Sequence, residues 1–166
     1  VRFAPDGTLY AVSSGPSSVA PEGLYRREPG GTWTGLGPNQ GSLYESDLKA
    51  LRFSADDPGL ILMGGADFGV AGFEVTIWRS PDSGVTWVKE HEGTANDFVL
   101  DLEIVADGQD QTMVASYDGF TAPQEGGVLR SIDGGLTWAP ALAGLPGFLR
   151  MPRVCVPRGG PQDLVL

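Results

Sequence analysis

Acidic residues stand next to aromatic residues at several points of this chain, and such neighbours can bind polyhydroxylated ligands. Aromatic rings pack on the apolar faces of sugar rings, and carboxylates accept hydrogen bonds from hydroxyl groups. Two carboxylates at a suitable separation can also hydrolyse a glycosidic bond. The alternative for any one of these residues is that it only forms a solvated turn. The candidate ligand-binding residues are Asp47, Asp67, Phe68, Tyr117, Asp118 and Arg150, none with an assigned catalytic role.

An internal repeat of about 51 residues must position these side chains. The octapeptides SPDSGVTW (80–87) and SIDGGLTW (131–138) share the pattern S-x-D-x-G-x-T-W, and a degraded copy, RREPGGTW, occupies 26–33. Short apolar segments recur in step with the octapeptides, at 1–3, 51–53, 102–104 and 154–156. Four short strand-like segments per repeat, bounded by Gly, Pro and Asp, are typical of β-propeller blades.

The repeat therefore predicts an all-β fold, a β-propeller segment of about three four-stranded antiparallel blades plus the start of a fourth. The expected blades span approximately 1–46, 47–97, 98–147 and, incomplete, 148–166, within a single partial propeller domain. Because propellers need about 4–8 blades, we expect this domain to be part of a longer chain.

The octapeptide suits a hairpin between the third and fourth strands of each blade. Its Asp can accept backbone N–H bonds, its Gly can adopt a positive φ, and its Thr suits a pleated strand. Its Trp supplies a large apolar ring for packing between blades. The residues expected to be structural are Ser80, Asp82, Gly84, Thr86, Trp87, Ser131, Asp133, Gly135, Thr137 and Trp138.

The order of the strands along the chain assigns each connection between strands to one of the two ends of a blade. The turns between strands one and two, and between strands three and four, share the end that carries the octapeptides. The connections between strands two and three lie at the opposite end, and we expect them at 14–23, 65–73 and 117–126. Each is longer than the usual hairpin loop of about 2–5 residues, so this end is the expected ligand face.

Composition narrows the classes of function. The 25 Gly and 13 Pro among 166 residues exclude a helical bundle and a coiled coil. A net charge of −10 without a basic cluster disfavours nucleic acid and anionic membrane surfaces as partners. One Cys and one His offer no disulfide framework and no Cys/His metal site, so we expect no metal and no cofactor. No apolar stretch approaches the roughly 18 residues of a membrane span, so we expect no membrane insertion.

The octapeptides resemble the Asp-box, also called the bacterial neuraminidase repeat, of β-propeller proteins. Because the octapeptides belong to a repeat of about 51 residues, the resemblance extends over essentially the whole chain. This repeat occurs in sialidases, xyloglucanase-type glycoside hydrolases, sortilin-type receptors and a photosystem II assembly factor, so it implies the fold rather than one function. We expect an exported protein, extracellular or periplasmic, that binds a glycan or a protein on the face opposite the Asp-boxes. Further blades of the same propeller, or a second copy of the chain, are the other expected partners.

Three functions stay open at this point. The first is a ligand-binding scaffold, the second is a glycoside hydrolase of which this chain is a fragment, and the third is an assembly or receptor scaffold. The sequence LRMP at 149–152 is similar to the Arg-Ile-Pro motif of sialidases, whose Arg binds the substrate carboxylate. Here Arg150 precedes Met instead of Ile and follows the two octapeptides, and no further arginines of the sialidase triad can be assigned.

Overall fold

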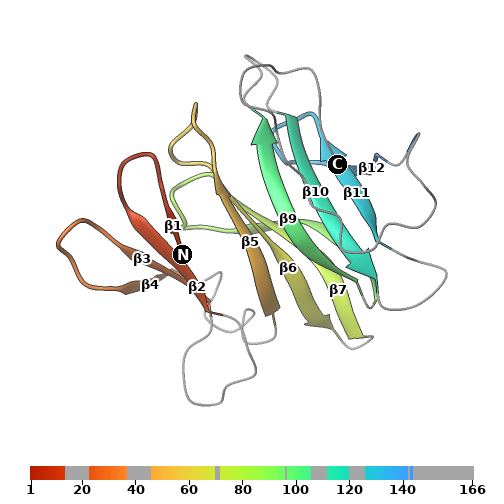
Figure 1. The fold of residues 1–166 in the computed structure, drawn as a ribbon, viewed down its shortest axis with the longest axis horizontal. Helices are drawn as coiled ribbons and strands as arrows, with labels where there is room; N and C mark the ends of the chain where they lie inside the picture. Colours follow the sequence, from red (N-terminus) through yellow and green to blue (C-terminus); the bar gives the residue numbers. More distant parts are fainter. Residues whose placement is uncertain are drawn as a thin grey trace.

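The computed structural model describes residues 1–13, 23–36, 46–69, 72–95, 97–105, 112–119, 126–141 and 143. These residues form three four-stranded antiparallel sheets, and in each sheet neighbouring strands follow one another along the chain (Figure 1). The first sheet consists of β1 (Arg2–Phe3), β2 (Leu9–Ser13), β3 (Gly23–Arg27) and β4 (Thr34–Leu36). The second consists of β5 (Ser46–Phe53), β6 (Ile61–Gly69), β7 (Gly72–Ser80) and β8 (Val88–Ala95). The third consists of β9 (Asp97–Val105), β10 (Thr112–Gly119), β11 (Gly127–Ser131) and β12 (Ala139–Pro140).

The second sheet packs against a neighbour on each of its two faces. Leu62 and Ile77 belong to the core shared with the third sheet, whereas Ile61, Met63 and Trp78 belong to the core shared with the first. Successive side chains of a strand point to opposite faces, so the unbroken apolar run at 60–63 supplies both cores. The run is therefore explained by burial on two sides.

The strand β9 contributes most to the contact between the second and third sheets. It packs across β5, β6 and β7, and Figure 1 shows it beside β5 and β6. Val99 and Leu102 of β9 are fully buried in that core. Four-stranded antiparallel sheets stacked in this way confirm the predicted all-β propeller segment. The predicted start of a fourth blade lies outside the described residues.

One of the predicted long loops is wrong. The segment 65–73 was expected to be a loop, but β6 continues to Gly69 and β7 begins at Gly72, and the two strands remain paired up to these residues. Gly and Asp are rare in strands, which is why the pattern suggested a loop. The strands continue because Ala66 and Val75, directly paired, are both buried.

The other two predicted loops have different outcomes. The strand β10 extends through Gly119, so the residues 117–119 are strand and not loop. The remainder of that segment lies outside the described residues, apart from Gly126. The predicted loop at 14–23 also lies outside them, apart from Gly23, which begins β3.

Close packing between β6 and β9 predicts the effect of a single methyl group. A Cβ at Gly64 would lie 2.6 Å from Val99 Cγ1 and 2.9 Å from Leu102 Cδ1. We expect Gly64→Ala to lower the free energy of unfolding by about 1–3 kcal/mol through overpacking. The matched control is Gly35→Ala, whose Cβ would meet only Tyr25 Cε1 at 3.8 Å. Urea denaturation of both variants checks this, and equal stability of the two would contradict the packing account.

Candidate functional site

Each octapeptide forms the turn between the third and fourth strands of its sheet. The segment 80–87 joins β7 to β8, and 131–138 joins β11 to β12. The Ser83 N–H donates to the Gly59 carbonyl at 2.8 Å, so the β5–β6 turn lies beside the β7–β8 turn. This contact confirms that these two kinds of turn share one end of the sheet. A further bond, from Arg79 Nε to the Gly134 carbonyl at 2.9 Å, links the second sheet to the octapeptide turn of the third.

One carboxylate organises each octapeptide turn. Asp82 accepts hydrogen bonds from the Thr86 backbone N–H at 2.7 Å and from the Thr86 hydroxyl at 2.6 Å. Asp133 accepts the same two bonds from Thr137. Because the hydroxyl and backbone bonds favour the charged carboxylate, they lower the pKa of Asp82, and they lower the pKa of Asp133 to about 2.

Serine and glycine complete the turn. The Ser80 hydroxyl donates to Asp82 Oδ1 at 2.9 Å and accepts from the Gly84 N–H at 2.8 Å. Gly84 and Gly135 have φ angles of 87° and 84°, which residues with a Cβ rarely adopt. A Cβ at Gly135 would in addition lie 2.9 Å from the Met113 sulfur. Glycine is therefore required by both conformation and packing.

Tryptophan closes each turn and anchors it to the neighbouring core. Trp87 Nε1 donates to the Gly84 carbonyl at 3.0 Å, and Trp138 Nε1 donates to the Gly135 carbonyl at 3.1 Å. Both rings pack at the edge of a core between sheets, Trp87 with the first sheet and Trp138 with the second. The expectation that the threonine belongs to a strand is wrong, because Thr86 precedes β8 and bonds the turn carboxylate.

The strand register gathers candidate residues of the second sheet at the end opposite the octapeptide turns. Asp67 pairs with Glu74 across β6 and β7, and Phe68 pairs with Phe73. Asp47 lies at the start of β5, one position from the residue paired with Asp67. These are the end of β6 and the starts of β5 and β7, which Figure 1 shows together at the lower edge of the sheet.

The third sheet places two further candidates at the end of β10. Tyr117 packs against the core between the second and third sheets, and its ring lies over Gly127 of β11. Asp118 pairs with Phe98 of β9 and is buried. Both residues lie on a strand and not on the predicted loop, because pairing with β9 continues to Gly119. Arg150, the remaining candidate, lies outside the described residues.

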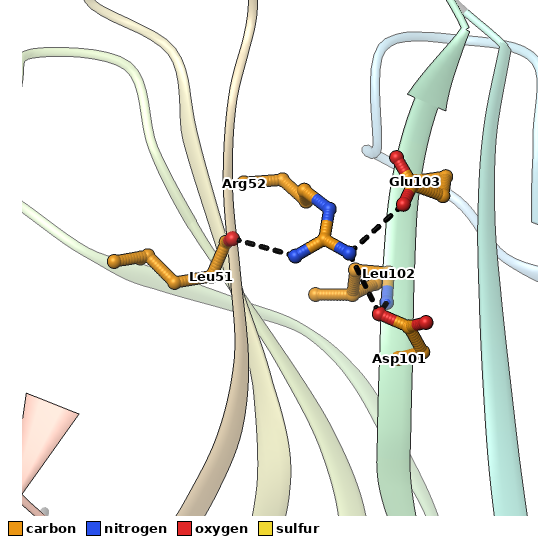
Figure 2. Close-up of polar contacts among 5 residues, drawn as sticks. All are labelled: Leu51, Arg52, Asp101, Leu102 and Glu103. Carbon is orange, nitrogen blue, oxygen red and sulfur yellow. Dashed lines mark hydrogen bonds and ion pairs between the residues drawn. The ribbon is translucent and has the colours of Figure 1, made fainter. Parts of the chain in front are cut away.

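Sequence reasoning missed an ion-pair cluster between β5 and β9. Arg52 Nη2 donates to Asp101 Oδ1 and to Glu103 Oε1, each at 2.8 Å, and Nη1 donates to the Leu51 carbonyl at 3.0 Å (Figure 2). The guanidinium lies between the two strands and is mostly buried, as are both carboxylates. A signal did exist, because Arg52 and Glu103 occupy the same position in successive repeats with opposite charges.

Within the described ranges, no group of three or more His, Cys, Asp or Glu side chains could hold a metal ion. A search of the same residues for a helix long and apolar enough to cross a membrane finds none.

The stacked four-stranded sheets define the class of this protein as a β-propeller segment. No protein-family model matches its sequence, and no curated protein matches it either. Among solved structures, it is similar to the crystal structure of the GH74 xyloglucanase from Xanthomonas campestris, with a TM-score of 0.49 and 21% sequence identity. The alignment covers 84% of this chain and 22% of that chain, so this chain corresponds to less than a quarter of the xyloglucanase.

The lowered pKa of Asp133 predicts a loss of stability in acid. The folded-state pKa of about 2 lies below the ordinary value of 3.8, so the contribution of Asp133 is complete above the ordinary pKa. It is lost as the pH falls through about 2. In Asp133→Asn we expect a weaker dependence of unfolding free energy on pH across this window, measured by urea denaturation. Identical pH dependences of the wild type and Asp133→Asn would contradict the assignment.

Arg52 is expected to contribute to the contact between the second and third sheets. Its removal in Arg52→Met leaves Asp101 and Glu103 close together without their shared donor. We expect a loss of about 1.5–3 kcal/mol in unfolding free energy, as for hydrogen bonds to charged groups. The matched control is Arg27→Met, since Arg27 is exposed over the Trp33 ring and should contribute below about 1 kcal/mol. Similar denaturation midpoints for the two variants would show that the cluster does not stabilise the interface.

Proposed function

We propose that this chain is part of an Asp-box β-propeller that binds carbohydrate at the end of its sheets opposite the octapeptide turns. The observation that carries the proposal is the register of the second sheet. It brings Asp67 beside Glu74 and Phe68 beside Phe73, at the end where β5 begins with Asp47 close by. Acidic and aromatic residues that are scattered in the sequence thus meet at one edge.

The chemistry of this edge suits a polyhydroxylated ligand. Carboxylates accept several hydrogen bonds each, and aromatic residues offer flat apolar surfaces. The third sheet adds Asp118, paired with Phe98, at the corresponding edge. A chain with net charge −10 is poorly suited to phosphate-bearing ligands, so a neutral glycan is the better match.

The Asp-box assignment is supported by the shared pattern of the two octapeptides together with their geometry. Both lie in the hairpin between strands three and four, and in both an aspartate bonds a threonine four residues later. We also propose that this protein acts in the extracellular or periplasmic space.

Four carboxylates outside the proposed site have structural roles. Asp101 and Glu103 lie two residues apart on β9, but both bond Arg52 between two sheets. Asp82 and Asp133 are engaged by the threonines of their turns. These four carboxylates have structural partners. A glycoside hydrolase containing this segment, and an assembly or receptor scaffold, are the alternatives that the test separates.

A glycan array probed with the chain, followed by calorimetry with the best-bound oligosaccharide, tests the proposal. We expect Asp67→Ala to weaken binding at least about tenfold, which corresponds to about 1.4 kcal/mol, while the melting temperature changes little. Asp82→Ala at the opposite end is the matched control, with a lower melting temperature and an affinity within about twofold. Equal affinity loss in both variants, or no bound glycan, would overturn the proposal, and turnover of sialosides or xyloglucan would replace it by the hydrolase alternative.

A further inference from the structure

Two positions of the octapeptides carry aliphatic side chains that the turns do not use. The sixth position holds Val85 and Leu136, which are 69% and 50% exposed. The second position of the later octapeptide holds Ile132, which is 62% exposed. A polar residue would suit a solvated turn at least as well at these positions. The turn itself therefore does not explain why they are aliphatic.

The second sheet shows that this exposure does not depend on a missing neighbour. That sheet packs against another sheet on each face, yet Val85 remains exposed, and so does Pro81 at the second position. Within the described parts of the second and third sheets, every large hydrophobic side chain that is exposed lies in or directly after an octapeptide. These side chains are Val85, Val88, Ile132 and Leu136. Exposed aliphatic side chains are thus a repeated property of the octapeptide end.

The two octapeptide turns lie side by side. The bond of 2.9 Å from Arg79 Nε to the Gly134 carbonyl joins the residue before the first octapeptide to the middle of the second. A Cβ at Gly135 would lie 3.7 Å from Arg79 Cδ, so the two segments are in close contact. Each turn is also held by the hydrogen bonds of its aspartate and its tryptophan. A partner therefore meets a preformed surface, and little ordering opposes its binding.

Acidic residues accompany the aliphatic side chains. The carboxylates of this end in the second and third sheets are Asp56, Asp57, Asp82 and Asp133, of which all except Asp82 are exposed. The bonds within the turns lower the pKa of Asp82 and Asp133 and so keep both charged. Among the basic residues described here, Arg79 and Lys89 are partly buried, against the Gly134 carbonyl and over the Trp78 ring, and Arg130 is exposed. Most of the exposed charge is therefore negative.

We propose that this octapeptide surface, formed by Val85, Ile132 and Leu136 with the surrounding aspartates, docks a protein segment in which aliphatic side chains alternate with Lys or Arg. Repeated exposed aliphatic residues mark a site of contact with a partner. The carboxylates favour a basic partner, because an acidic one would be repelled. Such a partner contacts the tips of the turns, so the hydrogen bonds that hold Asp82 and Asp133 can stay in place.

Fluorescence anisotropy with three labelled peptides of about 12 residues tests the proposal. The peptides alternate Leu with Lys, Leu with Glu, and Ser with Lys. We expect the Leu/Lys peptide to bind at least about tenfold more tightly than either of the others. Val85→Ser should weaken its binding at least about threefold, and the additional change Leu136→Ser should weaken it further. Val1→Ser is the matched control, since Val1 is 82% exposed on the first sheet outside the octapeptides. It should leave the affinity unchanged.

Several results would overturn the proposal. Absence of binding by the Leu/Lys peptide would do so, as would equal binding of the Ser/Lys peptide, which would show attraction by charge alone. Equal weakening by Val85→Ser and Val1→Ser would show that the octapeptide surface is not the site. Binding of phosphatidylcholine vesicles that Val85→Ser abolishes would assign the aliphatic residues to a membrane surface instead. Circular dichroism verifies that each variant is folded.

The docking surface and the proposed glycan site can be tested separately. They lie at opposite ends of the sheets, so Asp67→Ala should leave the affinity for the Leu/Lys peptide unchanged. Val85→Ser should likewise leave glycan binding unchanged. Failure of one proposal is therefore distinguishable from failure of the other.

Discussion

Burial of the second sheet on both faces is the constraint on which the rest of the structure depends. Because successive side chains point to opposite faces, Ile61 and Met63 must suit the first sheet while Leu62 suits the third. No face of β6 is left for solvent over this stretch. The charged side chain of Arg52 comes instead from β5, the first strand of the sheet, and reaches β9 beside the core and not through it.

The octapeptide turns connect local geometry to this packing. The carboxylate of Asp133 fixes the turn, and the glycine conformation it allows brings the backbone of Gly134 to Arg79 of the preceding sheet. Trp138, the last residue of the turn, reinforces the same contact by packing against the core shared with the second sheet. Each turn therefore stabilises its own hairpin and the stacking of its sheet on the previous one, which explains why the pattern recurs once per sheet.

The repeat made the fold predictable, because strand number, turn location and the role of the turn aspartates follow from residues that recur at one period. Features that depend on contacts between residues far apart in the sequence were harder to predict. The β6–β7 hairpin continues through Gly65 and Asp67, residues that disfavour strands, because Ala66 and Val75 are buried by the neighbouring sheet. The candidate site was also only partly predictable from the sequence. Residue types indicated which end of the sheets to examine, but only the register shows that Asp67 meets Glu74.

The two ends of the sheets differ in how their side chains contribute to the stability of the turns. At the octapeptide end, Asp82 accepts bonds from both donors of Thr86, so the carboxylate is already committed to its turn. A ligand there would have to displace bonds that hold the hairpin, which costs about 1–3 kcal/mol for each polar group left unpaired. At the opposite end, the pairing of β6 and β7 is supported by the burial of Ala66 and Val75, and Asp67 and Glu74 form the next pair toward the ends of these strands. The glycan site that we propose lies at this end, where a ligand does not have to break the hydrogen bonds of the octapeptide turns.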